Sequence, residues 1–351
     1  MALPALAADD DAALQHHLLL LPADVGHDEV EVLATSRFPR ATWETPPTTA
    51  RPRGRGQHPD PGVLRLSRHS TLVGPFTIDP GTASALGIPT SAALAYVLHA
   101  PVERGDAPWP GTGDRDGLAR AFANGLPVRD EERSVGWLVA AARRLGGAVR
   151  VAATGGSPGA LLVPDPAAAV DLTVWTDIWL EPDAALSVVR RAVPRAELNL
   201  PGTAWAGPPA GIGERPARGA EDLDDELRRR LHAAADDHDI ATLTAPPPMN
   251  AYGCLADLGV DGMLAVEVGG ETTLPPVIAA VPWASQGAVA YRVRWEPADL
   301  EEHNAERPGP EHRVARARAG ELVVAVARLV HVAVGGEITD EMGFVVDPED
   351  L

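Results

Sequence analysis

LVVAVARLVHVAVGGEIT, residues 322–339, shows how the chain is organised. Its first thirteen residues are apolar almost all round, which predicts that they belong to a helix at 312–334 that other elements nearly surround. Several of them are β-branched, so a strand is the alternative. Gly335 and Gly336 predict the end of the helix, because glycine accepts the left-handed conformation that caps a helix C-terminus. A short strand is expected to follow.

The same order of parts occurs earlier in the chain. In each half a strand pattern precedes a polar loop, a helix, a glycine pair and a short apolar strand that ends at a proline. The parts are 95–99, 130–145, 146–147 and 159–163 in the first half, and 290–294, 312–334, 335–336 and 343–347 in the second. We therefore predict two related modules that arose by internal duplication, although short helix and strand patterns also recur by chance.

Chain length and sequence breaks predict two domains. A chain of 351 residues exceeds the size at which one hydrophobic core usually keeps growing. Proline and glycine are frequent at 44–62 and 200–219, which is typical of loops or linkers. One sheet-rich domain with a long insertion is the alternative. The predicted division is an N-terminal module at 1–199 with a flexible arm at 45–62, a linker at 200–220 and a C-terminal module at 221–351.

The remaining patterns indicate the α+β class. In the helix at 130–145, apolar residues recur at spacings of three and four, which predicts a helix with one face on a sheet. Helices and strands mix without a regular βαβ rhythm, so each module is predicted to be a small mixed or antiparallel sheet covered by helices. Further helices are expected at 118–122, 184–193 and 221–238, and strands at 170–180, 261–268, 276–281 and 288–295.

The chain has no lysine, since all 30 basic residues are arginine. A Walker A loop, the strand lysine of a protein kinase and Schiff-base chemistry all need a lysine. Arginine does not replace it, because the guanidinium keeps its proton at any working pH. Those mechanisms are excluded for this chain alone, and no cofactor is predicted.

Charge and cysteine content indicate the partners and the compartment. The formal net charge of −19 repels phosphate backbones and anionic headgroups, so neither nucleic acid nor a membrane is expected as a partner. The basic stretch with Arg51, Arg53 and Arg55 is interpreted as part of a solvated linker. No apolar run approaches the roughly 20 residues of a membrane helix, and the acidic start does not resemble a signal peptide. A single cysteine, Cys254, is interpreted as a core residue in a reducing compartment, and a cytoplasmic location is predicted.

Two glycine-rich motifs resemble functional loops but lack essential features. GGSPG at 155–159 matches the nucleophile elbow of α/β-hydrolases, yet Pro158 has no N–H to act as the oxyanion donor after Ser157. GTGDRDG at 111–117 resembles a phosphate-binding or calcium-binding loop, but Asp116 stands where the dinucleotide fingerprint needs a glycine. Both motifs are interpreted as turns, the second as one that caps the helix at 118–122.

The densest group of possible metal ligands lies on the predicted helix at 221–238 and just beyond it. His232 and Asp236 share one face of this helix, whereas His238 points away. One helix therefore offers two ligands, and a metal site needs a third from elsewhere. A solvated helix end is favoured, and no metal site is predicted.

DLTVWTDIWL at 171–180 predicts a strand with two different faces. Alternation places Trp175, Asp177 and Trp179 on one face. Two tryptophans beside aspartates make a platform for a sugar or a peptide, so these three are the candidate binding residues. Because large aromatic side chains tend to be buried, the favoured interpretation is a contact with the other half, where the arginines of the strand at 290–294 balance the charge.

The leading hypothesis is a non-catalytic intracellular protein-interaction or scaffold protein of two duplicated α+β modules, with another protein as its partner. The alternative is a hydrolase or metal-assisted enzyme with acids and histidines in the cleft between the halves, because interdomain clefts are frequent sites. Its candidate catalytic residues are His232, Asp236 and Asp177.

Overall fold

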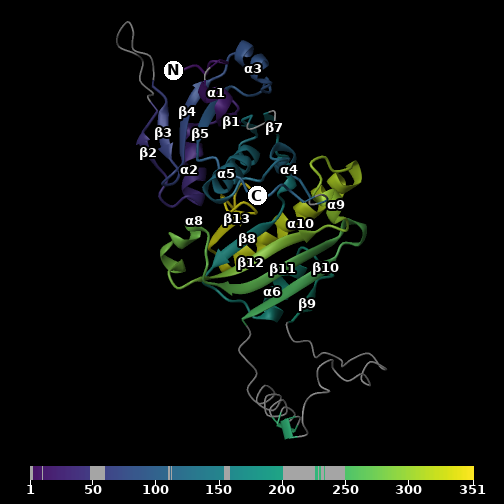
Figure 1. The fold of residues 1–351 in the computed structure, drawn as a ribbon. Helices are drawn as coiled ribbons and strands as arrows, with labels where there is room; N and C mark the ends of the chain where they lie inside the picture. The colour runs from purple at the N-terminus through teal and green to yellow at the C-terminus, as the bar shows by residue number, and fades with distance from the viewer. Residues whose placement is uncertain are drawn as a thin grey trace.

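Two seven-stranded antiparallel sheets with helices packed against them make up the computed structural model (Figure 1). The α+β class and the two related modules are thereby confirmed. None of the helices in the described part of the chain is long and apolar enough to cross a membrane. The structure describes residues 3–9, 11–47, 60–109, 111, 113–153, 159–200, 226, 227, 229, 230, 233 and 250–351.

The N-terminal sheet is built around β1, whose sequence His-Leu-Leu-Leu-Leu is buried on both faces. Leu19 and Leu21 belong to the core under the helices on one face, and Leu18 and Leu20 belong to a smaller core on the other. Across this sheet the order is β2 (Thr42–Thr45), β3 (Gly62–Arg65), β4 (Thr71–Thr77), β5 (Leu94–His99), β1 (His17–Leu21), β6 (Ala148–Val151) and β7 (Ala160–Leu162).

The C-terminal sheet repeats this order strand by strand, with each number raised by seven. The strand that begins each sheet in sequence, β1 or β8, lies between two later strands and is antiparallel to both. Across the second sheet the order is β9 (Glu197–Asn199), β10 (Ala251–Asp257), β11 (Met263–Glu271), β12 (Ala288–Glu296), β8 (Leu172–Thr176), β13 (Glu337–Asp340) and β14 (Val345–Val346).

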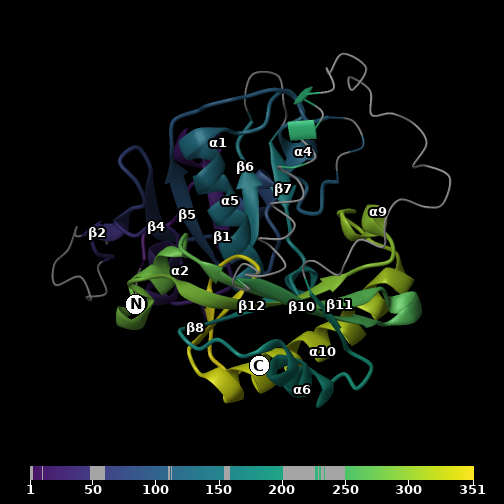
Figure 2. The ribbon, with the colours of Figure 1, turned by 90° about the horizontal axis from the view of Figure 1, so that it is seen from below.

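The helices occupy equivalent places in the two modules. The longest helix of each module crosses over the sheet, α5 between β5 and β6, and α10 between β12 and β13. Figures 1 and 2 show α10 and α6 on the same face of the C-terminal sheet, where both contribute to its larger core. The helices of the N-terminal module are α1 (Asp11–Gln15), α2 (His27–Arg37), α3 (Pro80–Leu86), α4 (Leu118–Ala121) and α5 (Arg129–Arg144). Those of the C-terminal module are α6 (Pro182–Arg190), α8 (Pro276–Ala279), α9 (Leu300–His303) and α10 (Pro310–Val334), and 3-10 turns lie at Pro166–Ala168, Gly259–Asp261 and Pro282–Ala284.

The sheets divide the chain at a different place from the predicted modules. The chain passes from the first sheet to the second between β7 and β8, so residues 172–199 belong to the second sheet rather than to the first module. The reason is topological, because β8 has to lie between β12 and β13 as β1 lies between β5 and β6. Most of the predicted arm at 45–62 and all but residue 200 of the predicted linker lie outside the described residues.

Two local expectations from the sequence were wrong. The strand expected at 276–281 is the short helix α8, which Pro276 can begin because a first helical residue needs no N–H donor. The strand expected at 170–180 ends at Thr176. Beyond it the backbone bonds to tyrosine hydroxyls instead of to a strand, since Leu180 N–H donates to Tyr291 Oη (2.7 Å) and Tyr252 Oη donates to Leu180 O (2.5 Å).

Trp175 and Trp179 therefore lie in different cores. Trp175 packs beneath α8, and its Nε1–H donates to Thr339 Oγ1 (2.9 Å). Trp179 packs on the helix-covered face, edge-to-face with Tyr252 at 5.2 Å between ring centroids. α8, which covers Trp175, contacts α2 of the N-terminal module.

The turn between β13 and β14 joins the two modules. Phe344 is fully buried in the core beneath α2 and α5 of the N-terminal module, together with Trp137. Arg37 donates to the backbone oxygen of Met342 (2.8 Å), and Arg144 lies 3.9 Å from Asp340. One apolar side chain surrounded by polar contacts thus fixes the C-terminal sheet against the N-terminal helices.

We expect Trp175→Ala to lower the free energy of unfolding by about 3 to 5 kcal/mol, because it empties a core position and frees the Thr339 hydroxyl. Trp179→Ala should cost less, since Trp179 is only partly buried. Urea unfolding of the two single variants measures the difference. Equal losses would show that the two tryptophans do not differ in burial as described.

Candidate binding site

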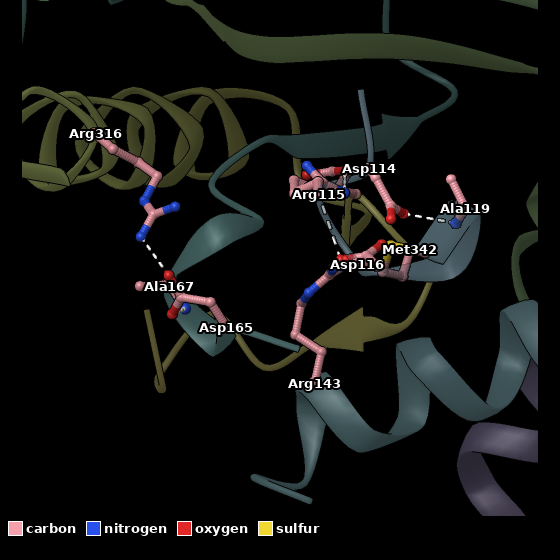
Figure 3. A network of polar contacts seen from close by, with 10 residues as sticks. Asp114, Arg115, Asp116, Ala119, Arg143, Asp165, Ala167, Arg316 and Met342 are labelled. Carbon is pink, nitrogen blue, oxygen red and sulfur yellow. Dashed lines mark hydrogen bonds and ion pairs between the residues drawn. The ribbon is translucent and has the colours of Figure 1, made fainter. Parts of the chain in front are cut away.

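A polar network lines the contact between the modules (Figure 3). Asp114 caps α4 by accepting the N–H groups of Ala119 and Arg120, both at 2.8 Å. This bears out the interpretation of the loop at 111–117 as a helix cap. The next two residues form ion pairs. Arg115 pairs with Glu341 of the C-terminal module (2.6 Å), and Asp116 pairs with Arg143 of α5 within the N-terminal module.

The same loop holds α9 of the C-terminal module in place. Asp114 N–H donates to Asn304 O (2.8 Å), at the residue that follows α9. Arg120 pairs with Glu306, which lies two residues after Asn304 in the chain (2.7 Å). Further along the contact, Arg316 of α10 pairs with Asp165 (Figure 3). These bonds fix the position of the segment between β12 and α10.

In the N-terminal module, the first turn of α5 contributes to a closed cluster of polar side chains. Glu131, the third residue of α5, is 1% exposed and receives hydrogen bonds from His17 Nε2 (3.2 Å) and the Glu103 N–H (2.7 Å). The Ala152 N–H donates to Nδ1 of His17 (3.1 Å), so the proton of the neutral ring lies on Nε2. Both ring nitrogens are satisfied, and His17 is a structural residue.

Arg104 completes this cluster. Its guanidinium pairs with Glu131 and lies 4.8 Å from the ring centre of Phe122, which follows α4. Burial favours a raised pKa for Glu131, but the hydrogen bonds from His17 and Arg104 outweigh it and hold the pKa below its usual value. The cluster is thus an ion pair sealed by a histidine and an aromatic ring.

The equivalent place in the C-terminal module is open. His312, the third residue of α10, is 8% exposed and contacts Trp295 and His303, at 5.2 and 5.8 Å between ring centroids. Its Nε2 is buried and has no hydrogen-bond partner among the described residues. Beside it lies a cavity of about 760 Å³, bounded by the end of β12, the loop around α9 and the first turns of α10. We call this cavity the α10 pocket.

Carboxylates dominate the charge of the α10 pocket. Four of its lining residues, Asp261, Asp299, Glu302 and Glu311, are acidic, and Arg318 is its one lining arginine. Arg318 lies 3.5 Å from Asp261. Glu302 accepts the Gly309 N–H (2.5 Å) at the start of α10.

His312 of the pocket and the neighbouring His303 both have lowered pKa values, so they are mainly neutral at pH 7. Burial lowers the pKa of His312, and the guanidinium of Arg316 lowers it further, against the opposing charges of Glu302 and Asp299. Burial also lowers the pKa of His303, with the charge of Arg115 adding to the effect. A neutral His312 can accept one hydrogen bond from a bound group or donate one to it.

The residues that line the α10 pocket offer binding chemistry. None of these described residues carries a hydroxyl, thiol or amine, and their ionisable groups are carboxylates, an imidazole and a guanidinium. In the described residues, no group of three or more His, Cys, Asp and Glu could hold a metal ion. What the pocket presents is an aromatic wall, a buried imidazole nitrogen and an acidic rim.

The residues singled out from the sequence lie elsewhere. Asp177 is exposed in the loop after β8, and Trp175 and Trp179 are in the two cores described above. Asp171 lies 3.5 Å from Arg294, but β8 and the strand at 290–294 are neighbours in one sheet, so this pair does not join the two halves as the favoured interpretation expected. His232 and Asp236 lie outside the described residues, as does Ser157. Of the candidate catalytic residues, the structure thus describes only Asp177.

Cys254 is buried on β10, and burial raises the pKa of its thiol to about 11. A thiol with that pKa is a poor nucleophile at neutral pH. The interpretation of Cys254 as a core residue agrees with this position.

Sequence analysis missed Trp295, His303 and His312. The signal available was weak, because two histidines nine residues apart flank a proline-containing loop and no metal spacing joins them. Their meeting depends on α9 folding back onto the end of β12.

No protein-family model matches this chain, and no curated protein and no solved structure matches it significantly.

The same substitution at the two equivalent clusters should have opposite effects. His17→Phe removes two satisfied hydrogen bonds and should lower the free energy of unfolding by about 2 kcal/mol. His312→Phe replaces a buried nitrogen that lacks a partner and should raise the free energy of unfolding by about 1 kcal/mol. Urea unfolding at pH 7.5 measures both. Losses of similar size in the two variants would mean that His312 is as well bonded as His17.

Acid should destabilise the protein partly through His303 and His312. Their pKa values in the folded state lie below the ordinary value of 6.5, so the unfolded chain binds more protons as the pH falls. The stability that the neutral rings contribute is present above about pH 6.5 and is lost below it. Unfolding curves at pH 7.5 and pH 5.5 should differ less for His312→Phe than for the wild-type chain. An unchanged difference would exclude His312 from this effect.

Proposed function

We propose that this protein is a non-catalytic binding protein that holds a segment of a partner protein in the α10 pocket, on a scaffold of two α+β modules. The observation that carries this proposal is the buried Nε2 of His312, which has no partner among the described residues, on a residue that lines a cavity of about 760 Å³.

The energetic cost of this nitrogen supports a binding role. A buried polar atom without a hydrogen bond costs about 1 to 3 kcal/mol, and such atoms are rare in folded proteins. In the equivalent cluster of the N-terminal module, the buried Glu131 receives hydrogen bonds from His17 and Glu103 and pairs with Arg104. The buried Nε2 of His312 lacks a hydrogen bond beside an open pocket, and a bound group would supply it.

The rim of the pocket suits a protein partner. Val260 and Val314 line the pocket and are 88% and 49% exposed, so apolar contact area lies next to acidic groups. Such a mixture is typical of protein interfaces, which combine an apolar centre with a polar rim. The net charge of −19 argues against nucleic acid as the partner.

The contact between the modules supports the scaffold part of the proposal. Asp114, Arg115 and Arg120 of the N-terminal module hold the segment around α9 and the turn after β13. The segment around α9, which contributes Asp299 and Glu302 to the pocket lining, is therefore braced from the other module. A braced wall lowers the conformational entropy that binding would otherwise cost.

Selection from a displayed library of random peptides, with the full chain as bait, tests this function. We expect peptides that bind the wild-type chain and lose at least about tenfold in affinity for Val314→Trp, which fills the mouth of the pocket. Val332→Trp is the matched control, because Val332 is exposed on the same helix and does not line the pocket. Failure to enrich any peptide, or equal binding to both variants, would contradict the proposed function.

A further inference from the structure

We infer that the group held in the α10 pocket is the guanidinium of an arginine side chain on the partner. This inference rests on the proposed function and adds the chemical class of the ligand. Four features carry it: the charge of the lining, the carboxylates at the start of α10, the hydrogen-bonding residues that line the cavity, and the occupant of the equivalent cluster in the N-terminal module.

The lining carries a surplus of negative charge. Arg318 is balanced by Asp261, which leaves the carboxylates of Asp299, Glu302 and Glu311 without a lining cation. Glu311 is exposed in the first turn of α10 and makes no ion pair with the described residues. A positively charged group entering the pocket is attracted, and the strongly acidic surface favours its approach.

An anionic ligand is disfavoured, although a helix begins at the pocket. The N-terminus of a helix ordinarily attracts anions through its free N–H groups. Here Glu302 already accepts the Gly309 N–H, and Glu311 places a second carboxylate in the first turn. A further negative charge would be repelled by both.

Shape and hydrogen bonding favour guanidinium over ammonium. A guanidinium is planar, offers five N–H donors in a fixed fork and stacks on aromatic rings. The pocket offers flat rings at Trp295 and His312, one imidazole nitrogen able to accept a hydrogen bond, and carboxylates near it. An ammonium group presents a compact point charge and uses the ring faces less well.

The N-terminal module already contains the arrangement that we infer. There the guanidinium of Arg104 contacts the third residue of α5 and lies over the aromatic ring of Phe122. In the C-terminal module the third residue of α10 is His312, with the rings of Trp295 and His303 beside it. The segment 297–302, which follows β12 as Arg104 follows β5, contains no arginine. An arginine from outside would fill the place that Arg104 fills in the first module.

Titration of the full chain with the capped tripeptide acetyl-Ala-Arg-Ala-amide, followed by amide NMR, tests the inference. We expect the largest shifts at the Trp295 indole N–H and the first turn of α10. The peptide with citrulline in place of arginine keeps the shape but loses the charge, and should bind at least about tenfold more weakly. The lysine peptide should fall between the two.

Two glutamates on α10 provide matched variants. Glu311→Gln should lower the affinity for the arginine peptide by about threefold or more. Glu321 is exposed on the same helix outside the pocket, so Glu321→Gln should leave this affinity unchanged. Equal binding of the arginine and citrulline peptides, or equal effects of the two variants, would overturn the inference. If displayed peptides compete at the pocket but contain no arginine, the binding function stands and the ligand class is wrong. If no peptide of any kind reaches the pocket, both fail.

Discussion

A long helix packed across a seven-stranded antiparallel sheet is the interaction on which both modules depend. In each module the helix joins two strands that are parallel to each other and separated by the first strand, so the crossover fixes the strand order. The apolar face of α5 and the almost wholly apolar α10 supply the burial that holds this crossover on its sheet. The β13–β14 turn then carries Phe344 from one module into the core of the other, so the two crossovers also determine how the modules meet.

The two modules share one fold, but the first turn of α5 differs from the first turn of α10. At the start of α5, the ion pair of Glu131 and Arg104 is buried beside Phe122 and beside His17, whose two ring nitrogens are both hydrogen-bonded. At the end of β12, the start of α10 is open and carries a histidine whose Nε2 lacks a partner within the described chain. Repeats that share a fold are free to diverge at one site, because the packing that maintains the fold lies in the cores. The pocket can therefore differ between the modules while the cores keep the fold.

Sequence patterns predicted the parts that depend on long periodic segments. The helices at 130–145 and 312–334, their glycine ends and the repeated order of elements were confirmed because apolar spacing and glycine conformation act locally. The central strand β1 was missed, since five residues give too short a pattern, and β8 was assigned to the wrong sheet, since pairing with β12 and β13 is a long-range event. The site was missed for the same reason: Trp295, His303 and His312 meet only when α9 folds back over the strand end.

The inferred guanidinium in the α10 pocket would take the place that the guanidinium of Arg104 holds in the N-terminal cluster. A crystal structure of the full chain soaked with N-acetyl-arginine amide tests this claim most directly. The account predicts planar density in the pocket, with one guanidinium nitrogen within hydrogen-bond distance of His312 Nε2 and another near the Glu311 carboxylate. Density for the ligand only at other acidic surfaces, such as that of Glu267 on the open face of the sheet, with an empty pocket, would contradict it.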